Sequence, residues 1–349
     1  MLYIITTTGK CNLKCKYCGG SFPEMFVPYD VKYDIQSLTE LINRDREATV
    51  VYYGGEPLIN WKFIKELNYR LNVKRIGIQT NATLVRNLDY DFWKYFDFSL
   101  LSIDGDEFIT DLNRGIGTYK KVIDAGKYLK GFGKELIARM VVTMKSNIYK
   151  DVKHILDLYI FDKVHWQLDV VWDDRWDLIS FASENYLPGI EKLMSMFMEN
   201  ARNGRIIKIV PFLGILSSFY FKKFEYFPCG AGKYSITINT DGRILACPIA
   251  VSEEWNNIGF IGEGFKPLNM PQECIKCEYF NYCGGRCLYS FMERYWGNDG
   301  FKEVCEITKR TIDIVLSKTV ELNELIDKKI ISKDQLRYDP LDDSTEVIP

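Results

Sequence analysis

The sequence predicts an α/β fold, in which a partial (β/α)6 barrel is followed by a small cysteine-rich domain. The first observation is an alternation of apolar, β-rich runs with segments of helical period through the first half of the chain, typical of parallel strands joined by helices. The second is a change of pattern near Gly204, where a hairpin signal and a cysteine-rich loop region replace that alternation.

Six strands are expected in the first half, and each of them begins a βα unit. Their ranges are 2–8, 49–53, 75–80, 96–103, 136–143 and 164–171. In barrels and in open α/β sheets, ligands lie at the carboxyl ends of parallel strands. Functional residues are therefore expected directly after these strands.

The second half is expected to form a domain of its own, which gives a barrel at 1–203 and an auxiliary domain at 204–335. Its segment SITINTDGRILACPI alternates on both sides of Asp241-Gly242, a strong signal for a β-hairpin. Residues 303–332 have the pattern of one long helix. The last residues, 336–349, lack any period and are expected to form a flexible tail.

Composition excludes several classes of protein. The 349 residues are 47% hydrophobic, enough for a sizeable core, and 45 Lys plus Arg nearly balance 47 Asp plus Glu, so no nucleic-acid partner is expected. No run approaches the roughly 20 apolar residues of a membrane helix, and the apolar run at the amino terminus is too short for a signal peptide. We expect a cytoplasmic protein without a membrane partner, whose ten cysteines bind metal rather than form disulfides.

Three cysteines follow the first strand in the segment KCNLKCKYCGG. Cys11, Cys15 and Cys18 have the spacing CxxxCxxC, and three thiolates on one loop suit an iron–sulfur cluster or zinc. Structural zinc usually has four protein ligands, and neither histidine of the chain, His154 or His165, is near this loop. An iron–sulfur cluster is favoured, with zinc or simple thiol burial as alternatives.

This loop, in its place after the first strand, resembles the signature of the radical S-adenosylmethionine (SAM) superfamily, whose domain is a partial TIM-type barrel. The resemblance implies a [4Fe-4S] cluster on the three cysteines, with an open iron that chelates the amino and carboxylate groups of SAM. It also implies that one electron, from a reductant such as ferredoxin or flavodoxin, cleaves SAM to methionine and a 5′-deoxyadenosyl radical.

Motifs at the ends of the next strands add to the resemblance. The segment GGEP resembles the family's GGE motif, whose backbone and carboxylate receive the SAM ammonium. The segments QTNAT, SIDG and NRG also match, and an arginine fork suits the SAM carboxylate. Taken singly, each polar residue is better explained as a turn, a helix cap or a packing residue. The SAM-binding residues implied are Tyr17, Gly54, Gly55, Glu56, Gln79, Asn81, Ser102 and Arg114.

The other seven cysteines resemble the SPASM extension of this superfamily at every spacing. The resemblance implies two auxiliary [4Fe-4S] clusters, and therefore three clusters in all. The outer cluster would be ligated by Cys274, Cys277, Cys283 and Cys305, and the inner one by Cys229, Cys247 and Cys287. Residues 230–235 contain no further cysteine, so the inner cluster would keep an open iron. One or two zinc sites within 274–287 are the competing interpretation.

Polar residues near the sixth strand are candidates for the substrate side of the site. Gln167 and Asp169 share one face of that strand by the period of two, and together with Asp104 they are the candidate catalytic residues. No catalytic base is identified. Residues 173–175 are expected to form a charged surface loop, and the aromatic run 212–227 is expected to be core packing.

The resemblance implies a radical SAM enzyme that abstracts hydrogen from a peptide or protein and oxidises or cross-links it. Sulfatase maturases, which make formylglycine, differ in carrying a tyrosine where Gly20 stands and an aspartate where Pro248 stands. Because the chain begins at its first strand, a separate leader-recognition protein, or direct reading by the barrel, is expected to replace a leader-recognition domain. The alternatives are a radical SAM enzyme acting on a small molecule in cofactor or haem synthesis, a formylglycine-forming maturase, or a non-catalytic electron carrier or zinc-stabilised binding module.

Overall fold

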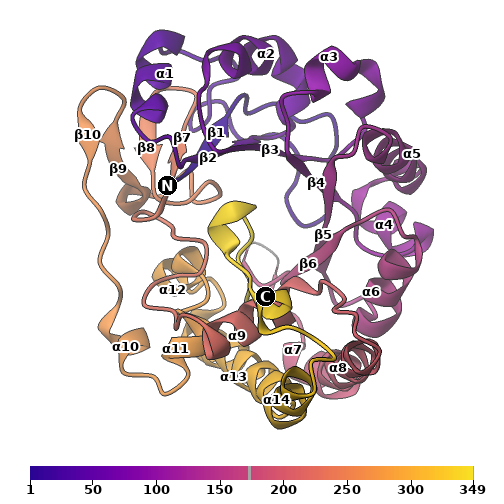
Figure 1. Cartoon of the computed structure of the whole chain (residues 1–349). Helices are drawn as coiled ribbons and strands as arrows, with labels where there is room; N and C mark the ends of the chain where they lie inside the picture. Colours follow the sequence, from indigo (N-terminus) through magenta and orange to yellow (C-terminus); the bar gives the residue numbers. More distant parts are fainter. Residues whose placement is uncertain (172–173, 349) are drawn as a thin grey trace.

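The computed structural model describes residues 1–171 and 174–348, and its central feature is a sheet of ten strands rolled into an incomplete barrel (Figure 1). The first six strands are parallel and lie in chain order. They are β1 (Leu2–Thr6), β2 (Thr49–Tyr53), β3 (Arg75–Thr80), β4 (Phe98–Ser102), β5 (Glu135–Val142) and β6 (Lys163–Leu168). The six expected strands and the fold class are confirmed.

The second half of the chain extends the same sheet from the free edge of β1. Strand β7 (Ser235–Ile238) pairs parallel to β1, and β8 (Arg243–Leu245), β9 (Asn257–Phe260) and β10 (Gly264–Phe265) continue it antiparallel. The expected turn at Asp241-Gly242 joins β7 to β8, where Gly242 adopts φ 94°. One sheet thus runs through both the barrel and the cysteine-rich half.

Helices cover the outside of the six parallel strands (Figure 1). Several begin with an aspartate that accepts a hydrogen bond from an amide three residues on, as Asp34, Asp89 and Asp106 do. The helices of this half are α1 (Ile35–Asn43), α2 (Trp61–Arg70), α3 (Tyr90–Trp93), α4 (Glu107–Arg114), α5 (Thr118–Lys130), α6 (Ile148–Asp157), α7 (Leu178–Phe181) and α8 (Leu187–Arg202).

Helices of the second half close the ring between β6 and the auxiliary strands (Figure 1). They are α9 (Val210–Tyr220), α10 (Gln272–Ile275), α11 (Phe280–Cys283), α12 (Leu288–Glu293), α13 (Gly297–Leu316) and α14 (Thr319–Asp327). Helix α9 packs against β6 and is buried along most of its length, so the first part of the aromatic run, 212–218, is core packing as expected. None of the described helices has the length and apolarity to cross a membrane.

The expectation of one long helix over 303–332 is wrong, because two helices occupy this range. Helix α13 ends at Leu316 and α14 begins at Thr319. The Ser317 hydroxyl donates to the Ile314 carbonyl oxygen at 2.7 Å, and the Thr319 hydroxyl donates to the Leu316 carbonyl oxygen at 2.7 Å. Such local side-chain bonds satisfy the carbonyls at the end of the first helix and compete with helical continuation.

The barrel strands alternate between an outer face that packs on helices and an inner face that lines the lumen. Part of the lumen is filled by apolar side chains, with Leu2, Ile4, Phe98 and Ile137 in one buried cluster. Gly77 on β3 makes room for this filling, because a Cβ atom there would lie 2.2 Å from Cζ of Phe98. The polar cavity residues Gln79, Ser102 and Gln167 lie nearer the carboxyl ends of their strands.

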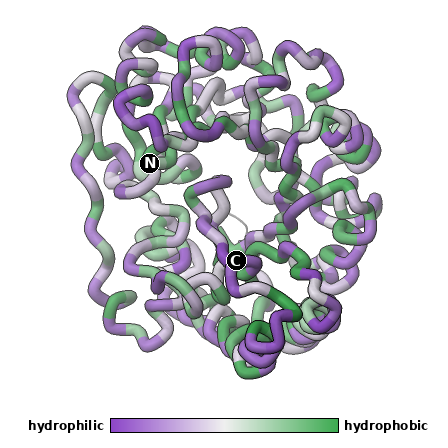
Figure 2. Tube along the Cα trace, viewed as in Figure 1, coloured by the Kyte–Doolittle hydropathy of each residue, from purple (hydrophilic) through white to green (hydrophobic). Residues whose placement is uncertain are grey.

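The carboxyl-terminal segment, expected to be a flexible tail, is packed into the centre of the ring (Figure 1). It crosses the amino ends of the strands, where the buried Asp343 accepts from Nζ of Lys163 at 2.7 Å. Val347 is fully buried against Gly214 of α9. Figure 2 shows that this central segment is largely hydrophilic, so ion pairs and single apolar anchors hold it rather than a periodic apolar face.

Candidate active site

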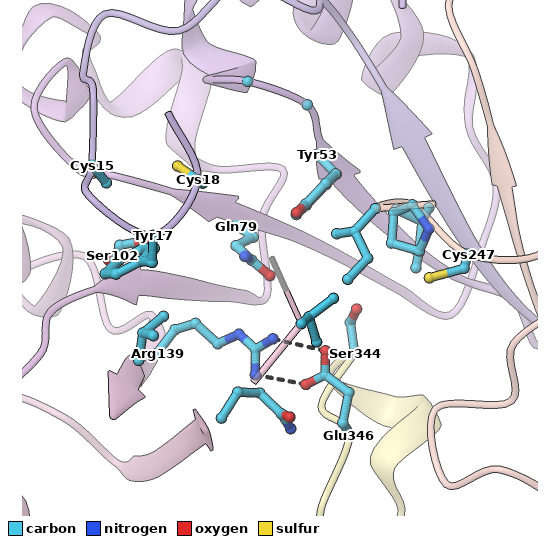
Figure 3. Close-up of a pocket in the computed structure, with 18 of the residues that line it drawn as sticks. Cys15, Tyr17, Cys18, Tyr53, Gln79, Ser102, Arg139, Cys247, Ser344 and Glu346 are labelled. Carbon is cyan, nitrogen blue, oxygen red and sulfur yellow. Dashed lines mark hydrogen bonds and ion pairs between the residues drawn. The ribbon is translucent and has the colours of Figure 1, made fainter. Parts of the chain in front are cut away.

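A cavity of about 290 Å³ lies within the barrel at the carboxyl ends of the strands. Figure 3 shows the side chains that converge on it from the barrel strands, from the first cysteine loop and from the carboxyl-terminal segment. It brings together the first three cysteines and all the residues expected to bind SAM. These are Cys11, Cys15, Cys18, Tyr17, Gly54, Gly55, Glu56, Gln79, Asn81, Ser102 and Arg114.

The first cysteine loop is braced by neighbouring elements before any metal is considered. The Cys11 amide donates to Oγ of Ser21 at 2.9 Å, and Nδ2 of Asn81 lies 3.9 Å from the Cys11 sulfur. The Cys15 thiol donates to the Cys18 sulfur, which lowers the pKa of Cys18 and raises that of Cys15. The loop therefore presents three cysteine sulfurs at the cavity wall, where they could ligate a metal as thiolates.

The glycines of the GGEP segment allow its backbone to pack closely against the backbone of residues 8–10. The Gly55 amide donates to the Thr8 carbonyl oxygen at 3.0 Å, and the Glu56 amide donates to the Lys10 carbonyl oxygen at 2.8 Å. A Cβ atom on Gly55 would lie 2.3 Å from the Lys10 oxygen, and Gly54 adopts φ 145°. Only glycine fits here, so the end of β2 supports the cysteine loop as well as lining the cavity.

Glu56 is fully buried and joins β2 to β3. Its carboxylate accepts from the Leu58 amide at 3.1 Å, from Oγ1 of Thr80 at 2.7 Å and from the Asn81 amide at 2.8 Å. Burial raises its pKa to about 7, although these three hydrogen bonds oppose the shift. A cation bound beside it in the cavity would favour the ionised form.

Asp104 was a candidate catalytic residue, and the structure contradicts this role because Asp104 is fully buried and does not line the cavity. It holds Arg114 instead, accepting from Nε at 3.0 Å and from Nη2 at 2.8 Å. It also accepts from Tyr17, Asn113 and the Val141 amide. Asp104 is therefore a positioning residue for Arg114 and for the Tyr17 ring over which that guanidinium lies.

The other two catalytic candidates, Gln167 and Asp169, do line the cavity. Nε2 of Gln167 donates to the Ile348 carbonyl oxygen at 3.3 Å, so this amide is tied to the carboxyl-terminal segment. Of the expected surface loop, Asp173 lies outside the described residues, and the exposed Arg175 pairs with Glu303 at 2.5 Å. The described part of that loop is on the surface, as expected.

The remaining cysteines lie around two cavities, and Cys287 lines both of them. Those assigned to the inner cluster line the cavity already described, and those assigned to the outer cluster line a second cavity of about 220 Å³. The first set is Cys229, Cys247 and Cys287, and the second is Cys274, Cys277, Cys283 and Cys305. In the described part of the chain, no three potential ligands converge closely enough to hold a single metal ion. The thiols instead line two cavities, each large enough for a cluster of several atoms.

Arg286 lies between these two sets of thiols and lines both cavities. It is 6% exposed, it adopts φ 57°, and its Nε has no hydrogen-bond partner among the described residues. A buried guanidinium nitrogen without a partner is costly, and a left-handed backbone at a non-glycine residue adds strain. An anionic cluster on either side would supply the missing partner, so this set of residues fits iron–sulfur clusters.

The comparisons with known proteins agree with this arrangement. The Radical SAM superfamily matches residues 5–159, which include the cysteine loop and the motifs after β2, β3 and β4. The chain therefore contains a radical SAM domain over these residues, and it is an enzyme. The family uses SAM and a [4Fe-4S] cluster. A cysteine-type anaerobic sulfatase-maturating enzyme of Clostridium perfringens (strain 13 / Type A) is 25% identical over 336 residues, covering 82% of this chain and 88% of that protein.

Two solved structures share the fold of this radical SAM enzyme. Native anSMEcpe with bound AdoMet and the Cp18Cys peptide superposes with a TM-score of 0.73 at 20% identity, covering 94% of this chain and 99% of that one. Streptococcus suis SuiB bound to its precursor peptide SuiA gives 0.52 at 16% identity, covering 84% of this chain and 72% of that one. These likenesses confirm a partial barrel followed by a carboxyl-terminal domain.

The radical SAM enzyme also has cavity residues that sequence reasoning missed. Arg139, on the inner face of β5, donates from Nη1 and Nη2 to the two carboxylate oxygens of Glu346 at 2.6 and 2.7 Å (Figure 3). Ser344 lies beside this pair and lines the same cavity. A lone arginine in the apolar run ELIARMVV was a usable signal for Arg139. Nothing in the sequence pointed to Glu346, which is 207 residues away.

Gly20 and Pro248, the two positions at which the sequence departs from the sulfatase maturases, both line the cavity. Neither residue has a side chain that can donate, accept or transfer a proton. The departures therefore lie where the substrate would be handled, rather than on a remote surface.

Proposed function

We propose that this radical SAM enzyme carries three [4Fe-4S] clusters and abstracts hydrogen from a peptide or protein substrate in order to oxidise or cross-link it. One observation carries the proposal: a single cavity is lined by the first three cysteines, by every residue expected to bind SAM, and by the three inner-set cysteines. Substrate in this cavity would lie between the SAM site and an auxiliary site.

The cluster assignment is the one implied by the cysteine spacing. Cys11, Cys15 and Cys18 would hold the SAM cluster, and the inner and outer auxiliary clusters would take the two sets already described. When bound, the first cluster and SAM supply a radical able to remove hydrogen from an unactivated carbon. An external one-electron donor such as ferredoxin or flavodoxin, and a separate leader-recognition protein, belong to the same proposal.

The residues of the chain would bind and orient SAM at the strand ends. The Arg114 fork has five N–H donors, and Asp104 occupies two nitrogens of it, so donors remain for the SAM carboxylate. Glu56 and the Gly54-Gly55 backbone would receive the ammonium. The apolar inner walls, including Leu168 and Ile249, would exclude water from the reacting carbon.

A peptide substrate is favoured by the proteins that this chain resembles. The anSMEcpe structure contains the Cp18Cys peptide, and the SuiB structure contains its precursor peptide. Formylglycine formation is disfavoured because Gly20 and Pro248 replace the tyrosine and aspartate of the maturases.

The test is SAM cleavage in the presence of candidate substrates. Anaerobically reconstituted enzyme is incubated with dithionite, SAM and either peptides encoded beside its gene or a pool of small metabolites. We expect a peptide to stimulate 5′-deoxyadenosine release by about tenfold, which corresponds to about 1.4 kcal/mol in barrier, and to change mass by the loss of hydrogen. Stimulation by metabolites alone would contradict the proposal, whereas formylglycine on a sulfatase peptide would contradict only the exclusion of maturase activity.

A further inference from the structure

The Arg139–Glu346 pair has the geometry with which proteins recognise a carboxylate ligand. Two guanidinium nitrogens of Arg139 each donate to one oxygen of Glu346, at 2.6 and 2.7 Å, in a fork that gives both strength and orientation. Here the carboxylate belongs to the chain's own terminal segment rather than to a ligand.

The fork belongs to the active-site cavity and not to the protein surface. Arg139 is register partner to Ser102 on β4 and to His165 on β6, and its side chain is 14% exposed. Since neighbouring strands lie roughly 4.8 Å apart, Arg139 is one strand from Ser102, a proposed SAM contact. A ligand on this fork would therefore lie beside the SAM site.

His165 lies beside the fork, with its Nε2 3.6 Å from Oε2 of Glu346. It is fully buried, and burial followed by the charge of Arg139 keeps its pKa well below the usual range, so the imidazole is neutral. Its Nδ1 accepts from Nη1 of Arg139. A neutral acceptor orients the guanidinium without cancelling its charge, so Arg139 still requires an anionic partner.

Glu346 can leave the fork without unfolding the terminal segment. Its side chain is 30% exposed, whereas Asp343 before it and Val347 and Ile348 after it are fully or almost fully buried. These neighbours anchor the backbone on both sides. Rotation of one side chain is then enough to free Arg139, and an unpartnered buried guanidinium would take up another carboxylate.

We propose that Arg139 is a carboxylate-binding subsite of the active-site cavity, that Glu346 fills it in this structure, and that a carboxylate of the substrate competes with Glu346 for it. The subsite itself stands on the geometry of the fork, and only the identity of the competing ligand rests on the proposed function. A peptide substrate would supply the carboxylate from an acidic side chain or from its carboxyl terminus.

Chemical rescue with acetate tests the subsite on the full-length reconstituted enzyme. We expect Glu346→Ala to lower the thermal midpoint by roughly 5 °C, since it leaves Arg139 buried and unpaired. Sodium acetate should restore most of that loss, and sodium chloride at the same ionic strength should not. Arg139→Met combined with Glu346→Ala should lose the acetate response. Glu303→Ala, which breaks the exposed pair with Arg175, is the matched control and should show no response.

Other outcomes separate the possible sources of the carboxylate. SAM affinity is measured on the same variants, and we expect Glu346→Ala to leave it unchanged. Absence of acetate rescue, or equal rescue of Glu303→Ala, would overturn the subsite. Rescue by SAM in place of acetate, with higher SAM affinity in Glu346→Ala, would overturn the assignment to substrate. If acetate fails to rescue Glu346→Ala while the enzyme still cleaves SAM, only this inference is refuted. If acetate rescues the variant but the wild-type enzyme does not cleave SAM, the proposed function is refuted and the subsite stands.

Discussion

Replacing Asp104 by alanine is expected to destabilise the protein by about 3–5 kcal/mol, because it leaves a buried arginine without its charge partner. Asp104 is fully buried, and Arg114 is 6% exposed. The carboxylate accepts two hydrogen bonds from that guanidinium and one each from Tyr17, Asn113 and the Val141 amide. Alanine removes all of these acceptors at once.

Urea unfolding of the Asp104→Ala variant measures this loss, and the same helix offers a control. Glu107 on α4 pairs with Lys120 at 3.1 Å, but both side chains are more than half exposed. Glu107→Ala should therefore cost no more than about 0.5 kcal/mol. If the two variants are equally stable, Asp104 does not anchor Arg114, and the positioning role assigned to it is wrong.

Replacing Arg286 by methionine is expected to lower the reduction potentials of the auxiliary clusters by on the order of 60 mV, a tenfold change in a one-electron equilibrium. Arg286 is buried between the two sets of cysteines, and its Nε has no partner in the described part of the chain. A cation beside a cluster favours the reduced and more negative state, so its loss makes reduction harder.

Redox titration followed by electron paramagnetic resonance measures this shift, together with iron content. Arg294→Met is the matched control, because Arg294 lies in the same region but is already paired with Glu273 at 2.5 Å. The control should shift the potentials by much less. Equal potentials in the wild type and the Arg286 variant, with full iron content in both, would show that Arg286 does not compensate cluster charge.

The strands and the cysteine sets could be predicted because their signals are local. The runs TVVYY and RIGIQT are strands over the very ranges expected, since β-branched and apolar residues fill parallel strands buried on both faces. The hairpin followed from Asp241-Gly242, which needs only the adjacent residues. The cysteine spacings could likewise be read directly from the sequence. The structure gathers the cysteines around the cavities, although Cys274, Cys283 and Cys305 lie in helices.

The rest could not be predicted because it depends on contacts between distant parts of the chain. Asp104 was expected to face substrate, but Arg114, ten residues on, folds back upon it. The terminal segment has no periodic spacing of apolar residues, and its burial depends on Lys163 and Gly214, which belong to other elements. The Arg139–Glu346 pair exists only once the segment has entered the barrel.

The central claim is that the cysteines bind iron–sulfur clusters and that the first cluster cleaves SAM. The most direct measurement is iron content together with dithionite-driven release of 5′-deoxyadenosine, for the wild type and for a variant with Cys11, Cys15 and Cys18 all replaced by alanine. We predict about twelve irons per wild-type chain, with about four lost and all SAM cleavage lost in the variant. A full iron content without SAM cleavage in the wild type, or cleavage that persists in the variant, would contradict the claim.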